Sequence, residues 1–364
     1  MLTTRCLSVF SLAVMIAMIG PSLCGGAPLV VETEDAAPQY NLYFGDLHSH
    51  TSYSDGDGTP DEAFEAAQVA GADFLAITDH HYLLRDVEWA DILRSADAHS
   101  SSAFAAIAAY EYFVPGINEL NIYGIPYMPP DASQFRPSGV FPWIYDWIAG
   151  EPGAVGQWNH PLSYGYPDAW DYFQFDFLTE ERDLAMGMIE CYNGNIRESS
   201  YIKALDAGWH MMPTATADTH SADWISGSEV RTVLLAPSLG REDLYDAMRD
   251  GRGYATLDSN LRILYTLNGA AMGSVLSGRP SFVANIHIED PDGPASDAIT
   301  LVEIVSDGGN VVASMPGDGS AAFDWTVTLT SDDASYYFVR VYTGSNELGI
   351  PGVTAWTAPV WTGA

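Results

Sequence analysis

The chain has 364 residues, of which 47% are hydrophobic and 12% aromatic, so it can bury a substantial core and is not a disordered protein. Its length predicts one large domain followed by a smaller one. The formal net charge of −34 repels polyanions, which excludes long nucleic acid as an expected partner.

The N-terminus has the pattern of an export signal. Arg5 precedes an apolar run over residues 7–19, which is too short for a convincing membrane span and is typical of a signal-peptide core. We expect residues 1–26 to be a signal peptide and residues 27–39 a linker, so the protein would be exported to the periplasm, the outside or the cell surface. A lipid anchor at Cys24 is the alternative, which the bulky residue before it disfavours. No later stretch is apolar enough to cross a membrane.

The first predicted strand covers residues 40–44 and leads into Asp46-Leu47-His48-Ser49-His50. Side chains two apart on a strand share a face, so His48 and His50 point the same way. Asp55 follows after a short turn. Two imidazoles and a nearby carboxylate are donors typical of a metal site.

A helix and a second strand come next. Thr59, Pro60 and Glu62 have the spacing of a capping box with proline at the first helical position, and Gly71 suits the helix end. Residues 73–78 then predict a buried strand that ends in Asp79-His80. The order is strand, helix, parallel strand.

This rhythm continues to residue 260 and predicts an α/β protein. Further helices are expected near 87–99, 199–207 and 241–250, and further strands over 103–109, 153–158, 185–189, 211–217 and 230–236. Six of the seven strands end in an acidic or metal-binding residue. In β/α barrels the carboxyl ends of the strands meet on one face, where the chemistry takes place. The candidate ligands at these ends are His48, His50, Asp55, His80, Glu111, His160, Asp218 and His220.

Five imidazoles and three carboxylates exceed what one ion needs, so two or three divalent ions are expected. Mixed nitrogen and oxygen donors suit Zn²⁺, Mn²⁺ or Fe²⁺ without choosing among them. Closely spaced ions would activate a water and stabilise a charged transition state, which is hydrolytic chemistry. We expect Glu111, which could bridge two ions, to act in catalysis with His160 and Asp218.

Five polar residues adjoin these ligands. They could orient the imidazoles through hydrogen bonds or reach the substrate, and the alternative is that they only cap strand ends. They are Asp46, Asp79, Asn159, Glu190 and Asn193.

Residues 113–150 interrupt the rhythm with many prolines and aromatic residues. We expect an aromatic insertion that serves as a lid or specificity wall, or that only packs over the barrel end. From residue 261 the hydrophobic period changes to two, which predicts a small antiparallel β-sandwich over 261–364. We expect no cluster of metal-binding residues in that domain.

The motifs in order resemble the PHP (polymerase and histidinol phosphatase) metallohydrolase family over about residues 40–260. They are Asp46-Leu47-His48-Ser49-His50-Thr51, Ser54-Asp55-Gly56, Ile77-Thr78-Asp79-His80, Glu111, His160 and Asp218-Thr219-His220. The resemblance implies a distorted seven-stranded β/α barrel. Residues 251–256 and 268–273 also resemble, more loosely, the branch that includes carbaryl hydrolases and carries a C-terminal β-domain.

The resemblance also implies how the ions are shared. One would be held by His48, His50, Glu111 and Asp218, a second by Glu111 and His160 with one more ligand, and a third by Asp55, His80 and His220. The branch supplies the missing ligand from a Gly-His-x-Asn segment, whereas this chain has Asn118-Glu119-Leu120-Asn121. Glu119 is therefore a further candidate ligand.

The leading hypothesis is an exported metal-dependent hydrolase of a small ester, first of all a phosphoester. A carbamate, amide or carboxyl ester hydrolysed by the same site is the second. The third is a non-catalytic cell-surface binding protein on a PHP scaffold, against which the intact ligand set argues. The natural substrate, the metal and the oligomeric state stay open.

Overall fold

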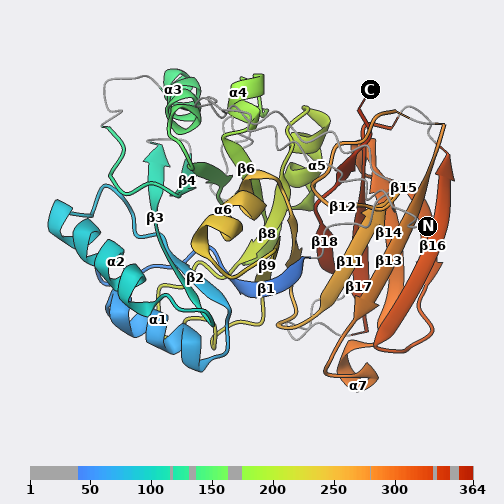
Figure 1. Cartoon of the computed structure of the whole chain (residues 1–364), viewed down its shortest axis with the longest axis horizontal. Helices are drawn as coiled ribbons and strands as arrows, with labels where there is room; N and C mark the ends of the chain where they lie inside the picture. Colours follow the sequence, from blue (N-terminus) through green and yellow to red (C-terminus); the bar gives the residue numbers. More distant parts are fainter. Residues whose placement is uncertain are drawn as a thin grey trace, which may run out of the picture.

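The computed structural model describes residues 40–114, 118–130, 137–162, 174–278, 280–330, 334–344 and 352–363. The expected signal peptide and linker, as well as Cys24, lie outside the described residues. The strands form one large mixed sheet and a second sheet with the order β12-β11-β13-β16. Helices gather around the first part of the chain, and the later part is built of strands (Figure 1). The mixed α/β class predicted from the sequence is confirmed.

The first part contains helices α1 (Pro60–Val69), α2 (Asp86–His99), α3 (Pro137–Gly150), α4 (Glu180–Asp183), α5 (Glu198–Asp206) and α6 (Arg241–Arg249). Its strands are β1 (Asn41–Asp46), β2 (Phe74–Ile77), β3 (Ala105–Val114), β4 (Asn118–Tyr123), β5 (Val155–Trp158), β6 (Met186–Asn193), β7 (Asn195–Ile196), β8 (Met212–Thr216), β9 (Arg231–Ala236) and β10 (Gly253–Thr256).

These strands follow one another in the order β10-β9-β1-β2-β3-β4-β5-β6, with β8 paired to β6. Strand β8 also contacts β9 and β10, so the sheet curls until its two ends meet. The seam is closed by a side chain: Oγ1 of Thr232 accepts a hydrogen bond from the amide of Ala215 at 3.1 Å and donates one to its carbonyl at 3.0 Å.

Two strands of this curled sheet were not predicted. Strand β4 lies between β3 and β5 and is antiparallel to both, so part of the expected aromatic insertion belongs to the sheet rather than to a loop. Helix α3 lies in the same stretch. Strand β10 adds to β9 in antiparallel register. The pairs β1–β2, β2–β3, β5–β6 and β6–β8 are parallel, as the strand-helix-strand rhythm predicts.

Local signals explain the first helix. Oγ1 of Thr59 accepts from the amide of Glu62 at 3.3 Å, and the Glu62 carboxylate accepts from the amide of Thr59 at 2.8 Å, which completes the predicted capping box. After the helix, Gly71 has φ of 84°, a conformation that favours glycine. The chain can therefore turn sharply into β2.

Strand β2 shows how the core is divided. Leu75 and Ile77 face the cluster that holds Phe64 of α1, whereas Phe74 and Ala76 face the interior of the curled sheet. All four residues of the strand are buried. Burying a large aliphatic or aromatic side chain contributes about 1.5–3 kcal/mol, so both layers stabilise the strands that carry the site.

The later strands are β11 (Arg262–Leu267), β12 (Ala270–Ala271), β13 (Ser281–Glu289), β14 (Ile299–Ser306), β15 (Asn310–Pro316), β16 (Ala322–Thr330), β17 (Tyr336–Thr343), β18 (Val353–Thr357) and β19 (Val360–Trp361). The sequence pattern predicts strands over 263–267, 282–288, 299–305, 323–329 and 336–342, which match β11, β13, β14, β16 and β17. Strands β12, β15, β18 and β19 and the short helix α7 (Pro294–Asp297) were not predicted.

The later strands form two layers whose facing side chains pack in one apolar cluster. The hydroxyl of Tyr265 in β11 donates to the carbonyl of Tyr337 in β17 at 3.1 Å across this interface. The large sheet continues from β10 through β18 and β17 to β14 and β15. The first and later parts of the chain are thus joined by unbroken strand pairing.

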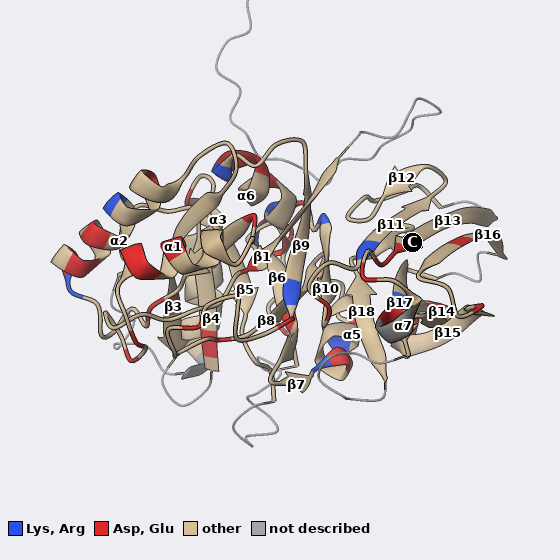
Figure 2. Ribbon diagram, turned by 90° about the horizontal axis from the view of Figure 1, so that it is seen from below, with Lys and Arg blue, Asp and Glu red and all other residues tan. Residues whose placement is uncertain are grey.

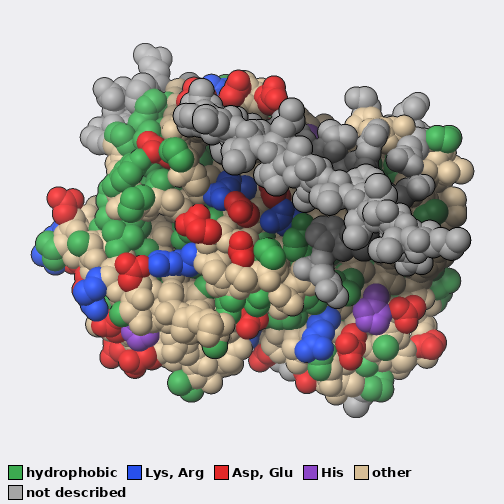
Figure 3. All heavy atoms as spheres, viewed as in Figure 1, with side chains coloured by type: hydrophobic (Ala, Val, Ile, Leu, Met, Phe, Trp, Pro, Cys, Tyr) green, Lys and Arg blue, Asp and Glu red, His purple; other side chains and the backbone are tan. Residues whose placement is uncertain are grey.

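Acidic residues are prominent on α1 and α2 and recur at places along the later strands (Figure 2). On the face drawn in Figure 3, the basic side chains of the described residues lie in separate small groups among acidic and apolar ones. None of the described helices combines the length and the apolar character that a membrane crossing requires.

Candidate metal centre

The predicted ligands meet at one end of the curled sheet. His48 and His50 follow β1, His80 follows β2, His160 follows β5, and the pair Asp218 and His220 follows β8. Glu111 lies within β3 and Glu119 within β4, the strand that was not predicted. Backbone hydrogen bonds join the strand ends. The amide of His50 donates to the carbonyl of Thr219 at 2.9 Å, and the amide of His81 donates to the carbonyl of Glu111 at 2.9 Å.

Glu111 is the centre of the cluster and is 1% exposed. Its Oε1 lies 3.2 Å from Nε2 of His48 and 3.3 Å from Nε2 of His160. Its Oε2 lies 2.9 Å from Nδ1 of His80 and 3.4 Å from Nε2 of His50. One carboxylate thus touches four imidazoles that come from three different strand ends, which is the arrangement a bridging ligand requires.

The other carboxylates surround this centre. Oδ1 of Asp218 lies 3.3 Å from Nε2 of His48 and 3.2 Å from Nε2 of His50. The two oxygens of Glu119 lie 3.4 Å from Nδ1 of His80 and 3.3 Å from Nε2 of His160.

Asp55 lies on the open side of the cluster. Its oxygens are 3.5 Å from Nε2 of His80 and 3.3 Å from Nε2 of His220. The structure therefore brings every predicted ligand into one cluster, although whether each binds an ion stays a prediction.

Three subsets have donor atoms close enough to share an ion, since all atoms of a subset lie within 4.8 Å of one another. They are the set His50, Asp55, His80 and His220, the set His48, His50 and Glu111, and the set His80, Glu111 and Glu119. Mixed imidazole and carboxylate donors suit divalent transition metals.

The orientation of the rings fits metal binding. Nδ1 of His48 lies 2.7 Å from a Glu190 carboxylate oxygen, and Nδ1 of His220 lies 2.8 Å from the carbonyl of Asp218. Because a carboxylate and a carbonyl accept hydrogen bonds, each Nδ1 carries a proton. Each Nε2 faces a carboxylate oxygen, of Asp218 for His48 and of Asp55 for His220, where it can hold either a second proton or a cation.

The same pattern occurs between two histidines. Nε2 of His48 lies 3.2 Å from Nε2 of His50. Oδ1 of Asp218, close to both nitrogens, is buried and accepts no hydrogen bond. A bound cation would satisfy all three atoms at once.

Charge in the cluster shifts the pKa of its imidazoles. Burial lowers the pKa of His48, but Asp218, Glu111 and Glu190 outweigh burial and hold that pKa well above its usual range. Burial likewise opposes protonation of His160, yet its contacts with Glu111 and Glu119 raise its pKa to about 10. Both shifts show a strongly negative local potential, which attracts cations.

The backbone is strained at two of the candidate ligands. His160 has φ of 26° and Asp218 has φ of 50°, both in the left-handed region that residues other than glycine rarely adopt. Such conformations cost of order 1–3 kcal/mol and persist where the surrounding structure enforces them. Here they turn both side chains from their strand ends toward Glu111 and His48.

Two predicted neighbours hold the loops. Asp46 accepts hydrogen bonds from the amide of His48 at 3.0 Å and from the amide of Ala217 at 3.0 Å, so it links the ends of β1 and β8. Asp79 accepts from the amide and the hydroxyl of Thr51 at 2.8 and 2.6 Å. Both carboxylates are buried and fix the segment that carries His50.

Three predicted neighbours touch the ligands themselves. Glu190 binds Nδ1 of His48 and the amide of His160. Asn193 donates to Glu190 at 3.0 Å, and Asn159 donates to Oε1 of Glu111 at 2.7 Å. These contacts are those of residues that orient ligands.

Sequence reasoning missed three supporting residues. Thr216 donates to Oε1 of Glu190 at 2.7 Å, Gln157 donates to the same oxygen at 3.4 Å, and Asn121 accepts from Asn159 at 2.8 Å. Their place in the sequence could have revealed two of them, because Thr216 and Gln157 lie near the carboxyl ends of predicted strands that lead to candidate ligands.

The open side of the cluster lies at Asp55 and His220, whose side chains are 50% and 40% exposed. A cavity of about 310 Å³ adjoins it and is lined by residues 216–221 together with Tyr192. Tyr82 is 54% exposed, and its ring centroid lies 5.3 Å from that of His80 and 5.5 Å from that of Phe113. An exposed aromatic rim therefore borders the cluster.

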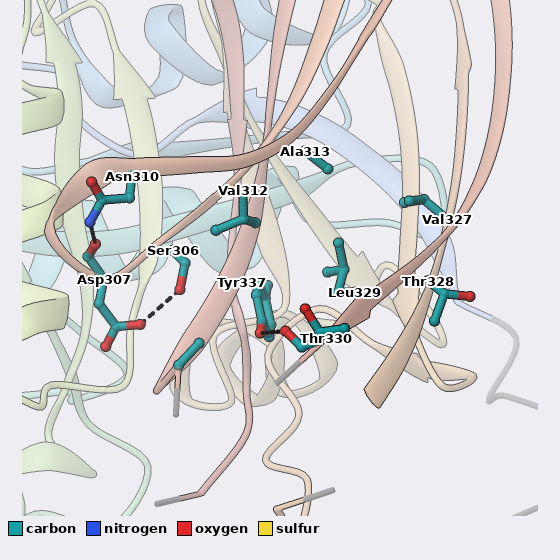
Figure 4. A pocket seen from close by; sticks show the side chains of 11 residues that line it. Ser306, Asp307, Asn310, Val312, Ala313, Val327, Thr328, Leu329, Thr330 and Tyr337 are labelled. Atoms are coloured by element: carbon teal, nitrogen blue, oxygen red, sulfur yellow. Dashed lines mark hydrogen bonds between the residues drawn. The ribbon is translucent and has the colours of Figure 1, made fainter. Parts of the chain in front are cut away.

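A larger cavity, of about 630 Å³, lies between later strands and away from the candidate ligands (Figure 4). Its walls carry aliphatic and hydroxyl side chains such as Val312, Leu329 and Thr328, and its single carboxylate, Asp307, accepts a hydrogen bond from Ser306 at 2.7 Å. This cavity lacks the donors that metal-dependent hydrolysis requires.

Residues 46–121 match the model of the PHP domain, which confirms the resemblance to that family. No curated protein matches the chain. Among solved structures, a two-domain protein from Bacteroides vulgatus, described as containing a predicted PHP-like metal-dependent phosphoesterase, is similar at 15% identity and a TM-score of 0.47 over 93% of this chain and 100% of that chain.

Two other solved structures are also similar. A protein from Bifidobacterium adolescentis, described as a metal-dependent phosphoesterase, shows 16% identity and a TM-score of 0.34 over 57% of this chain and 94% of that chain. An amidohydrolase from Chromobacterium violaceum shows 15% identity and a TM-score of 0.32 over 48% of this chain and 87% of that chain. All three TM-scores are below 0.5, so the domain assignment depends on the sequence match.

Proposed function

We propose that this chain is a metal-dependent hydrolase that acts on a small ester, first of all a phosphoester. The PHP domain match over residues 46–121 supports metal-dependent hydrolysis as the activity. The specific ester class is our own inference from the site. We also propose a PHP-like barrel, a C-terminal β-sandwich and export as the context in which the enzyme works.

The residues present fit two or three divalent ions. Glu111 would be shared, with His48, His50 and Asp218 on one side and His80, His160 and Glu119 on the other. Asp55 and His220, with His80 and His50, would hold the most exposed ion. Ions held by these residues would activate a water for attack and stabilise the negative charge that develops in the transition state.

The chain itself supplies position. Glu190 holds the proton on Nδ1 of His48, so that Nε2 is free to coordinate. Asp46 and Asp79 fix the two loops that carry the first ligands. The exposed edge near His220 and the adjoining cavity give a small substrate access to the cluster. The backbone and buried hydrogen bonds thus preorganise the donors before substrate arrives.

One observation carries this proposal: Nδ1 of His48 and Nδ1 of His220 are each held by an acceptor, and each Nε2 points at carboxylate oxygens of the cluster. Imidazoles oriented in this way through their other ring nitrogen are typical of metal ligands.

The test is a panel of nitrophenyl phosphate, phosphodiester, carboxyl ester and carbamate substrates, each with added Mn²⁺ or Zn²⁺ and each after treatment with a chelator. We expect metal-dependent turnover, fastest on a phosphoester, and its loss in Glu111→Gln. Glu181→Gln changes an exposed glutamate on α4 in the same way and is the matched control. Absence of turnover on every substrate by fully metal-loaded protein would favour the binding-protein alternative.

A second ester class is favoured by a specific feature. In the described residues, Asp55, Glu111 and Asp218 form ion pairs with histidines and with no arginine or lysine. With no basic side chain paired to these three acids, recognition of a phosphate would depend mainly on the ions, whereas the rim of Tyr82 and Phe113 suits an apolar group. A carbamate, amide or carboxyl ester is therefore the second candidate, and the same panel separates it from a phosphoester.

A further inference from the structure

A second group of donor residues lies outside the histidine cluster. Asp258, Asp290 and Asp297 each place one carboxylate oxygen within 4.8 Å of the other two, and the residues are 5%, 3% and 3% exposed. Asp290 and Asp297 lie in the stretch over 261–364 where we expected no cluster of metal-binding residues, and Asp258 lies just before it. The acids escaped notice in the sequence because more than thirty residues separate the first from the second.

The three carboxylates come from turns where the curled sheet joins the later strands. Asp258 lies between β10 and β11, Asp290 directly follows β13, and Asp297 ends α7 before β14. Pairing of Arg262 with Glu289 in the β11–β13 ladder brings the first two turns together.

Two of the turns hold their carboxylates in place. Oδ1 of Asp258 accepts from the amides of Asn260 and Leu261, both at 2.8 Å. Oδ1 of Asp290 accepts from the amide of Asp292 at 3.0 Å. The side chains are therefore positioned by the backbone and do not depend on one another for their orientation.

Two buried side-chain oxygens of these turns have no hydrogen-bond partner among the residues that the structure describes. One is Oδ2 of Asp290, and the other is Oδ1 of Asn260. Nδ2 of Asn260 donates to a carboxylate oxygen of Asp292 at 3.0 Å, so the amide oxygen of Asn260 is turned away from that acid. A buried carboxylate oxygen without a partner costs free energy, and an adjacent amide oxygen without one adds to that cost.

Two of the three carboxylates have no basic partner in the part of the chain that the structure describes, since neither Asp258 nor Asp290 forms a salt bridge there with an arginine, lysine or histidine. Ionised carboxylates this close need either protons or a cation.

We propose that Asp258, Asp290 and Asp297, with the side-chain oxygen of Asn260, form a binding site for one calcium ion. The donors are all oxygens, and Ca²⁺ takes six to eight oxygen ligands at about 2.3–2.6 Å from carboxylates, amide carbonyls and waters. Oxygens up to 4.8 Å apart can be spanned by one ion at such distances. The lack of any imidazole separates this site from the histidine cluster, whose mixed donors suit transition metals.

The site is independent of the proposed hydrolase activity. The ion would fasten the turn before β11 to the turns on either side of α7, and so fix the junction through which the large sheet passes from β10 to the later strands. Because calcium binds the folded chain and not the separated turns, it would raise the thermal stability of the whole protein.

The test uses the full chain, first stripped with a chelator and then loaded with Zn²⁺ or Mn²⁺ so that the histidine cluster is filled. Calcium binding is measured by equilibrium dialysis, and thermal unfolding is followed with Ca²⁺ or Mg²⁺ at millimolar concentration. We expect one calcium ion per chain, with Kd of order 10⁻⁴–10⁻³ M or tighter, and a rise in Tm of about 2–5 °C with Ca²⁺ that Mg²⁺ reproduces poorly.

Asp290→Asn should abolish calcium binding and the calcium-dependent rise in Tm, while its zinc or manganese content stays that of the wild type. In calcium-free buffer this variant should be no less stable than the wild type, because it removes a buried like charge. Asp318→Asn, at an exposed turn of the same domain, is the matched control and should respond to calcium as the wild type does.

Two results would overturn the proposal. The first is a wild-type chain that binds no calcium and shows no calcium-dependent Tm. The second is an Asp290→Asn variant that keeps both. If Asp290→Asn fails to fold, Asp258→Asn takes its place and should lose calcium binding and the calcium-dependent rise in Tm. Equilibrium dialysis of the wild type then still shows whether the chain binds calcium.

Discussion

Nδ1 of His48 lies 2.7 Å from Oε1 of Glu190, and both side chains are fully buried. Glu190 therefore decides which nitrogen of His48 carries a proton, and leaves Nε2 facing Glu111 and Asp218. Thr216 donates to the same glutamate oxygen at 2.7 Å and holds it in position. The orientation of His48 toward the other candidate ligands is thus set by Glu190, which is not itself among the candidate ligands.

Glu190→Gln is the first prediction. An amide can present its nitrogen to Nδ1 and so stabilise the wrong ring form of His48, which weakens the ion that His48 holds. We expect metal affinity and activity to fall about 10–100-fold, the range for loss of a partner that orients a ligand. Titration with Mn²⁺ or Zn²⁺ measures the affinity, and unchanged affinity would remove Glu190 from this role. Glu181→Gln is the matched control.

Glu119→Gln tests the residue that stands where the resemblance to the carbaryl-hydrolase branch implies a histidine. Its carboxylate contacts Nδ1 of His80 and Nε2 of His160 at 3.4 and 3.3 Å. The neutral amide is a poor ligand, so we expect the variant to bind about one ion fewer per chain, whereas Glu119→His should retain the ion. Elemental analysis counts the ions. Equal metal content in the wild type and Glu119→Gln would show that Glu119 binds none.

Asp55 should belong to the weakest ion. Its side chain is 50% exposed and its partner His220 is 40% exposed, whereas Glu111 and His48 are buried. Water competes more effectively for an exposed ion, so a chelator titration should remove one ion well before the rest. Asp55→Asn should eliminate that early step and leave the later ones unchanged. A single release step for all ions in the wild type would contradict this order.

Thr232→Val tests how the curled sheet is closed. The hydroxyl of Thr232 is the only side chain joining Ala215 of β8 to β9 among the hydrogen bonds of the described residues. Valine has nearly the same shape but leaves the amide and carbonyl of Ala215 buried without this partner, which costs about 1–3 kcal/mol. Urea denaturation should show this loss, and the exposed Thr328→Val should show almost none. Equal losses in both variants would mean that the seam is held elsewhere.

Much of the site could be predicted because the donors stand at strand ends. His48, His80 and Asp218 each follow a run of apolar residues that reads as a buried strand, and parallel strands bring such ends together. Residue type and position were then enough to propose one cluster. The backbone strain at His160 and Asp218 was beyond reach, since φ depends on tertiary packing rather than on local pattern.

The missed elements carry weak signals in the sequence. Strand β4 alternates Glu119 and Asn121, which face the site, with Leu120 and Ile122, but it is short and lies in a stretch rich in proline and aromatic residues that reads as an insertion. Strand β10 has only four residues and begins with Gly253. The calcium site was missed because single aspartates in turns are common in so acidic a chain, and only the folded structure brings these three together.

The central claim is that the strand-end donors bind divalent transition metals around Glu111. Elemental analysis of purified protein, reconstituted with Zn²⁺, Mn²⁺ or Fe²⁺ and freed of excess ions, tests it most directly when the wild type and Glu111→Gln are compared. The account predicts two or three transition-metal ions per chain in the wild type and a loss of more than one in the folded variant. A wild-type chain that stays free of these metals, or a variant with the same content, would contradict it.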